Sequence, residues 1–68
     1  MIAVISYSKY EFNDFIRSVH IDDRKIFRHV RDFEDVHGVK FTNVIKIGDY
    51  KRMPDFKALY FYALSRII

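Results

Sequence analysis

The first seven residues, MIAVISY, form an unbroken run of mostly apolar and β-branched side chains. A strand with one exposed face alternates apolar and polar residues, and this run does not alternate. Such a run is typical of a strand that is covered on both faces, as in the parallel sheets of α/β proteins. We therefore expect residues 1–7 to form the central strand of a sheet.

Two later segments also favour strands. Residues 25–31 (KIFRHVR) contain β-forming side chains together with three basic residues and a histidine, which suits an edge strand. Residues 39–48 (VKFTNVIKIG) place apolar and polar side chains largely on opposite parities, although Asn43 and Val44 interrupt the pattern. Between these segments, residues 32–38 begin with an acid and end in a glycine, which predicts one short helical turn.

Two helices are predicted from their entrances and their apolar stripes. Ser8 and Glu11 have the S-x-x-E spacing of a capping box, so a helix should begin after Ser8. Its stripe is Phe12, Phe15, Ile16 and Val19. The second helix should follow Met53-Pro54-Asp55, and its stripe is Phe56, Leu59, Tyr60, Ala63, Leu64 and Ile67.

This βαββα order predicts a single α/β domain over residues 1–68, a minimal Rossmann-like sandwich. A helix between strands indicates a crossover connection, so we expect a three-stranded parallel sheet in the order 2-1-3. The alternative is an α+β fold in which the second and third strands form an antiparallel hairpin across residues 32–38.

The composition argues against several classes of protein. Half of the residues are hydrophobic, too many for a disordered chain, while 31% are charged, which argues against a membrane protein. No uncharged run is longer than that of residues 1–8, which is far shorter than the roughly 20 residues of a membrane-spanning helix. Cysteine is absent, so we expect a cytoplasmic protein that folds without disulfides.

No sequence motif points to catalysis, to a cofactor or to a metal. The chain lacks the glycine-rich phosphate loops and the serine-nucleophile patterns, and it has no cysteine nucleophile. Three histidines, His20, His29 and His37, are not at metal-ligand spacing. We expect a protein that is not an enzyme and that binds neither cofactor nor metal.

Two alternative functions follow from the positive net charge of +3. The first is weak nucleic-acid binding, because a basic segment interleaved with rings offers cations for phosphates and surfaces for stacking. That segment contains Arg24, Lys25, Arg28 and Arg31. The second is binding of an anion or nucleotide at the start of the first helix, by Ser8, Lys9 and Arg52.

The interpretation that we favour rests on surplus aromatic residues. A domain of this size cannot bury all twelve rings, and Tyr and Phe are enriched in the cores of protein interfaces. We therefore expect a non-catalytic protein-interaction module that binds a partner or itself, as a dimer or larger assembly. The expected contact residues are Tyr10, Phe61, Tyr62 and Ile68. Short chains of this kind are typical of phage and plasmid genes, so we expect a modulator of a host protein.

Overall fold

The computed structural model describes residues 1–67 of the chain. The strands are β1 (Ile2–Ile5), β2 (Phe27–Val30) and β3 (Asn43–Lys46). The α-helices are α1 (Lys9–Arg17) and α2 (Phe56–Ser65). Three short 3-10 helices complete the described chain: η1 (Ile21–Ile26), η2 (Phe33–Asp35) and η3 (Tyr50–Arg52).

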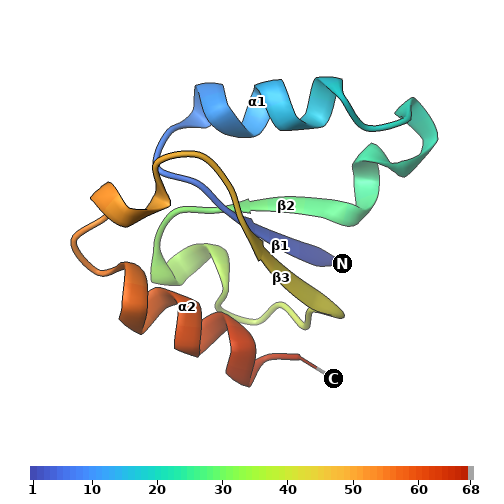
Figure 1. The fold of residues 1–68 in the computed structure, drawn as a ribbon. Helices are drawn as coiled ribbons and strands as arrows, with labels where there is room; N and C mark the ends of the chain where they lie inside the picture. Colours follow the sequence, from blue (N-terminus) through green and yellow to red (C-terminus); the bar gives the residue numbers. More distant parts are fainter. Residues whose placement is uncertain (68) are drawn as a thin grey trace.

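The sheet is parallel, with the predicted order β2-β1-β3. Ile2 lies opposite Phe27 of β2 and Asn43 of β3, and this register continues to the end of β1. Both later strands therefore pair with β1, which confirms the predicted α/β sandwich and excludes the antiparallel hairpin. Their carboxyl ends lie together on the left of Figure 1.

The helices cover opposite faces of this sheet, with α1 above it and α2 below it in Figure 1. The main core lies on the α2 side. Its buried residues are Ala3, Ile5, Val30, Val36, Phe41, Val44, Met53, Leu59 and Ala63. The α1 side is less tightly packed, because no residue of α1, all of which is described, is fully buried. No helix of residues 1–67 has the length and apolar character needed to cross a membrane.

The apolar face of α1 packs mainly through ring contacts to β2. Phe12 stacks on His29, with ring centroids 4.8 Å apart, and Phe15 meets Phe27 edge-on at 5.1 Å. These contacts place the predicted stripe of α1 against the edge strand. The helix is thereby fixed over β2 and β1.

The start of α1 differs from the predicted capping box in one respect. Ser8 caps the helix by accepting a hydrogen bond from the Glu11 amide at 3.2 Å. The Glu11 carboxylate, however, accepts a hydrogen bond from the Asp49 amide, 2.6 Å from Oε2, in the turn after β3. Gly48 makes this approach possible, because a Cβ at its position would overlap the Glu11 carboxylate. Gly48 therefore allows the Glu11 side chain of α1 to hydrogen-bond to the turn that follows β3.

The third strand is shorter than predicted, because residues 39–42 lead into it without joining it. Phe41 is fully buried, and its amide donates to the carbonyl of Arg66 just past α2 at 3.0 Å. Within β3, Val44 and Lys46 share the register positions of Ala3 and Ile5, so both face α2. The alternation of apolar and polar residues is interrupted at Asn43 and Val44, and β3 begins at this point.

Candidate functional site

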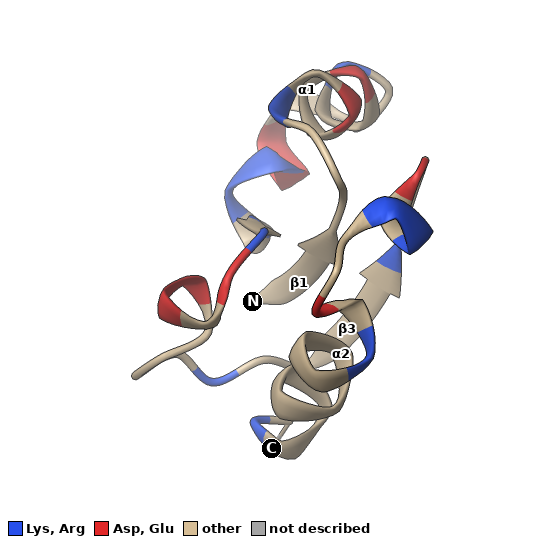
Figure 2. Cartoon of the chain, turned by 90° about the vertical axis from the view of Figure 1, so that its left-hand side faces the viewer, with Lys and Arg blue, Asp and Glu red and all other residues tan. Residues whose placement is uncertain are grey.

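Helix α2 is apolar around most of its circumference, with Lys57 as the only charged residue among its ten. Leu59 and Ala63 face the core, whereas Lys57, Ala58, Phe61 and Ser65 are exposed. We call these four exposed residues the outer face of α2. Figure 2 shows how little charge α2 carries beside α1, which has residues of both signs. A solvated helix face usually carries several charged groups, whereas the outer face of α2 has one charge, at Lys57, and a large exposed ring, at Phe61.

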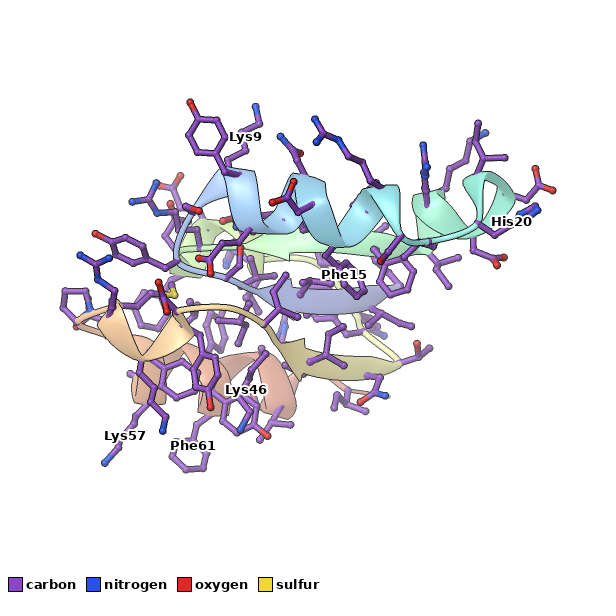
Figure 3. The ribbon with its side chains drawn as sticks, turned by 45° about the horizontal axis from the view of Figure 1, so that its top comes forward. Lys9, Phe15, His20, Lys46, Lys57 and Phe61 are labelled. Atoms are coloured by element: carbon purple, nitrogen blue, oxygen red, sulfur yellow. The ribbon has the colours of Figure 1, made fainter. Side chains whose placement is uncertain are left out.

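Phe61 is the prominent group on this face, with 65% of its surface exposed. It projects away from the sheet next to Lys57 (Figure 3). The spacing of residues 57, 61 and 65 places them on one line along the helix. A large exposed ring in such a position gains free energy when a partner removes it from water.

A row of rings continues from Phe61 toward β3. Successive ring centroids lie 6.0 Å apart for Phe61 and Tyr60, 5.7 Å for Tyr60 and Phe56, and 4.7 Å for Phe56 and Tyr50. The ammonium of Lys46 lies 4.8 Å from the Tyr60 centroid and 5.4 Å from that of Tyr50. This cation–π arrangement holds a positive charge at the border of the aromatic surface. The sequence suggests Lys46 only as an extension of the basic segment, although its position two residues after buried Val44 places it on the α2 side of the strand.

The other residues expected to contact a protein do not all lie with Phe61. Tyr62 is half-buried, packs against the core and lies 5.8 Å from the ring of Phe33 in η2. Tyr10 is 83% exposed, but it belongs to α1 on the opposite side of the sheet. Ile68 lies outside the described residues. The predicted contact residues that the structure describes therefore do not form one patch. Of these residues, Phe61 is the one that belongs to the outer face of α2.

A serine and a histidine come together beneath α1, where neither was predicted to act. Ser6 is fully buried; its Oγ lies 2.8 Å from His29 Nε2 and donates to the Ser8 carbonyl at 2.9 Å. His29 Nε2 also lies 3.4 Å from the Ser6 carbonyl, which can only accept a hydrogen bond. Because Ser6 Oγ donates to the Ser8 carbonyl, this geometry matches a His29 tautomer that donates from Nε2 to Ser6. The pair fixes the end of β1 to β2.

The residues predicted to hold an anion occupy three different environments. Ser8 Oγ accepts the Glu11 amide, and the Glu11 carboxylate lies in the same turn. Lys9 extends outward from α1, away from the sheet (Figure 3). The Arg52 guanidinium carbon lies 4.9 Å from the centroid of the Tyr7 ring. A carboxylate of the chain itself thus occupies the start of α1, and Arg52 faces a different surface.

The basic segment is spread along the β2 edge of the molecule. Arg24 donates to the carbonyls of Val19 and Arg17, and Arg28 donates to the carbonyl of Asp35 at 2.7 Å. Lys25 is exposed in η1, whereas Arg31 lies beyond the carboxyl end of β2. Arg24 and Arg28 thus form hydrogen bonds to backbone carbonyls within the domain. Nucleic-acid binding by this segment stays a prediction.

The ionisable residues do not form a metal site in the described part of the chain. Within residues 1–67, no three His, Asp or Glu side chains lie close enough together to hold a metal ion. Asp32 and Asp35 form a reciprocal capping box around η2. His20 accepts a hydrogen bond from the Asp22 amide at 3.2 Å and thereby caps η1.

Comparisons of this chain with models of protein families, with curated proteins and with solved structures found no match.

Proposed function

We propose that this chain is a non-catalytic interaction module whose outer α2 face binds another protein. The observation that carries the proposal is the exposure of Phe61 on a helix with one charged residue among its ten. Exposed apolar surfaces of this kind mark interaction sites in soluble proteins. A ring inserted into a partner's pocket is the type of residue that dominates binding energy at interfaces.

The charges around this face favour a partner that is not a second copy of the chain. The outer face of α2 carries Lys57 and no acid, and Lys46 lies beside the neighbouring Tyr60. Two such faces packed together would add positive charge to positive charge. A partner with an apolar pocket rimmed by Asp or Glu would be complementary in both respects.

The non-catalytic part of the proposal is supported by the Ser6–His29 pair. Ser6 is fully buried, and its hydroxyl proton is directed to the Ser8 carbonyl. A serine nucleophile needs an accessible oxygen and a base that accepts its proton. The first condition is not met at this position, because the Ser6 oxygen is buried.

The test compares Phe61→Ser with Ile21→Ser, which removes an equally exposed apolar side chain from η1. Each tagged protein is used to capture partners from a host lysate, and the captured protein is then purified and titrated against each variant. We expect the wild type and Ile21→Ser to bind the partner with similar affinity. The affinity of Phe61→Ser for the partner should be at least about tenfold lower. Lys57→Glu should also weaken binding, and added salt should reduce the association rate.

Two results would contradict this proposal. One is equal binding by Phe61→Ser and the wild type. The other is a concentration-dependent dimer in light scattering that Phe61→Ser dissociates, because the outer face of α2 would then bind a second copy of the chain.

A further inference from the structure

The carboxyl ends of the three strands meet at a crevice beyond β1. The chain leaves β1 toward α1 on one face and β2 toward η2 on the other, whereas after β3 it passes the start of α1 before it descends to α2 (Figure 1). Connections that diverge in this way open a crevice at the end of a parallel sheet, which is where open α/β proteins bind ligands. Tyr7, the second residue after β1, stands at this crevice.

A small cleft of about 120 Å³ is present at this point. Its lining residues are Tyr7, Arg31, Asp32, Phe33, Met53, Pro54, Asp55 and Leu59. Met53 and Leu59 are buried core residues, so the cleft reaches down to the core. Its volume is well below the roughly 300 Å³ at which sites begin to enclose a drug-sized ligand. Only a small group, with the atoms next to it, can enter.

Two arginines approach the Tyr7 ring from opposite edge strands of the sheet. The guanidinium carbon of Arg31, after β2, lies 5.8 Å from the ring centroid. That of Arg52, after β3, lies 4.9 Å from it. An arginine stacked on a ring is held in place while its N–H groups stay available at the edge of the guanidinium plane.

Neither arginine is neutralised by the described part of the chain. The ion pairs within residues 1–67 join Arg17 to Asp14 and His20 to Asp22, so no described carboxylate pairs with the guanidinium group of Arg31 or Arg52. The nearby Asp35 carboxylate accepts the backbone amide of Arg31 at 2.9 Å. Guanidinium groups keep their charge at all physiological pH values. Arg31 thus lines the cleft as a permanent cation, and Arg52 places a second one against Tyr7, which forms one wall of the cleft.

We propose that this cleft binds the phosphoryl group of a small phosphorylated molecule, through Arg31 and Arg52. A phosphate has several charged acceptor oxygens, so two guanidinium groups can each form charge-assisted hydrogen bonds to it. This site differs from the start of α1, where the carboxylate of Glu11 already lies. It is also separate from the interaction proposed for the outer face of α2.

The two acids of the lining restrict where the phosphoryl group can lie. Asp32 Oδ1 accepts the Asp35 amide at 3.2 Å, so this carboxylate is directed toward η2. Asp55 precedes α2 without a side-chain capping hydrogen bond, and its charge would repel an anion. Replacement of Asp55 by asparagine should therefore strengthen phosphate binding.

The experiment is a titration of ¹⁵N-labelled protein with inorganic phosphate, ribose 5-phosphate and ribose, followed by amide chemical shifts at low salt. We expect shifts around Tyr7, Arg31 and Met53 with both phosphates and none with ribose. The double variant Arg31→Gln/Arg52→Gln should bind at least about tenfold more weakly, since it removes the charge-assisted hydrogen bonds to the phosphoryl oxygens. Arg17→Gln, the same change at an exposed site on α1, should bind like the wild type.

The comparison of ligands also identifies the source of the phosphoryl group. Tighter binding of ribose 5-phosphate than of inorganic phosphate would indicate a sugar phosphate or nucleotide, and the reverse order would indicate free phosphate. Circular dichroism of the double variant checks that it is folded; if it is not, Asp55→Asn provides the test by its increased affinity. Three results would overturn the proposal: no binding by about 10 mM phosphate, undiminished binding by the folded double variant, or shifts confined to residues 8–11.

Discussion

The Glu11 carboxylate in α1 accepts a hydrogen bond from the backbone amide of Asp49 after β3, with an Oε2–N distance of 2.6 Å. This contact connects two turns that lie 38 residues apart in the chain. It depends on Gly48, which has a φ of 60° and no Cβ to collide with the carboxylate. The contact therefore couples a backbone conformation to a side-chain position.

Gly48→Ala should be much more destabilising than Gly38→Ala. Both glycines have positive φ, so each substitution carries a conformational cost of about 1 kcal/mol. At Gly38 a new Cβ meets nothing within 4 Å, whereas at Gly48 it overlaps Glu11. The end of the Glu11 side chain would have to move away and give up its hydrogen bond to the Asp49 amide. We therefore expect Gly48→Ala to lower the free energy of unfolding by about 1 to 2 kcal/mol more than Gly38→Ala, measured by urea denaturation.

The double variant Glu11→Ala/Gly48→Ala is the control for this comparison. Removal of the carboxylate also removes the collision, so the further cost of Gly48→Ala should fall to that of Gly38→Ala. Equal losses for the two single glycine variants would show that Glu11 does not occupy this position.

Ser6→Ala should destabilise the protein by about 1 to 3 kcal/mol although it removes one atom. The Ser6 hydroxyl lies between His29 Nε2 and the Ser8 carbonyl, and the residue is fully buried. The substitution leaves the Ser8 carbonyl without this donor. Thermal and urea unfolding measure the effect, and Ser65→Ala, at an exposed hydroxyl on α2, is the matched control. A loss no greater than that of Ser65→Ala would contradict the inferred role of the pair.

Much of the architecture follows from local patterns. The apolar run at residues 1–7 predicts the central strand and the basic segment at 25–31 predicts an edge strand, and the sheet order confirms both positions. Both strands are shorter than predicted: β1 spans Ile2–Ile5 and β2 spans Phe27–Val30, because residues 25 and 26 belong to η1. Ser8 caps α1 as predicted, and Asp32 caps η2. These features depend on residues that are close together in the chain, so one amino-acid sequence is sufficient to predict them.

The candidate sites were harder to predict because they depend on tertiary contacts. The meeting of Arg31 and Arg52 at Tyr7 requires the strand order and the length of each turn. The same is true of Glu11, whose carboxylate reaches Asp49 rather than completing the local capping box. Helical spacing suggested that Tyr62 is exposed, but the ring of Phe33 from η2 lies against it.

Phe61→Ala and Tyr62→Ala, at adjacent positions of α2, should distinguish a ring that is exposed at the surface from one that packs against the core. Phe61 is mostly exposed, so its loss should change the free energy of unfolding by no more than about 0.5 kcal/mol. Tyr62 packs against the core and Phe33, so its loss should cost more than about 1 kcal/mol. Denaturant titration measures both. A comparable loss for Phe61→Ala would mean that this ring supports the fold, and Phe61→Ser would then be unsuitable for testing partner binding.

Phe41→Ala should remove most of the stability of the domain. Phe41 is fully buried in the segment between η2 and β3, and its amide bonds to the carbonyl of Arg66. Truncation of a buried Phe costs about 3 to 5 kcal/mol, which is a large part of the free energy of unfolding of a small domain. Phe41→Leu, which keeps most of the apolar volume, should lose less. Circular dichroism during thermal unfolding distinguishes the outcomes: if Phe41→Ala and Phe41→Leu unfold at the same temperature as the wild type, residues 39–42 do not pack against the end of α2.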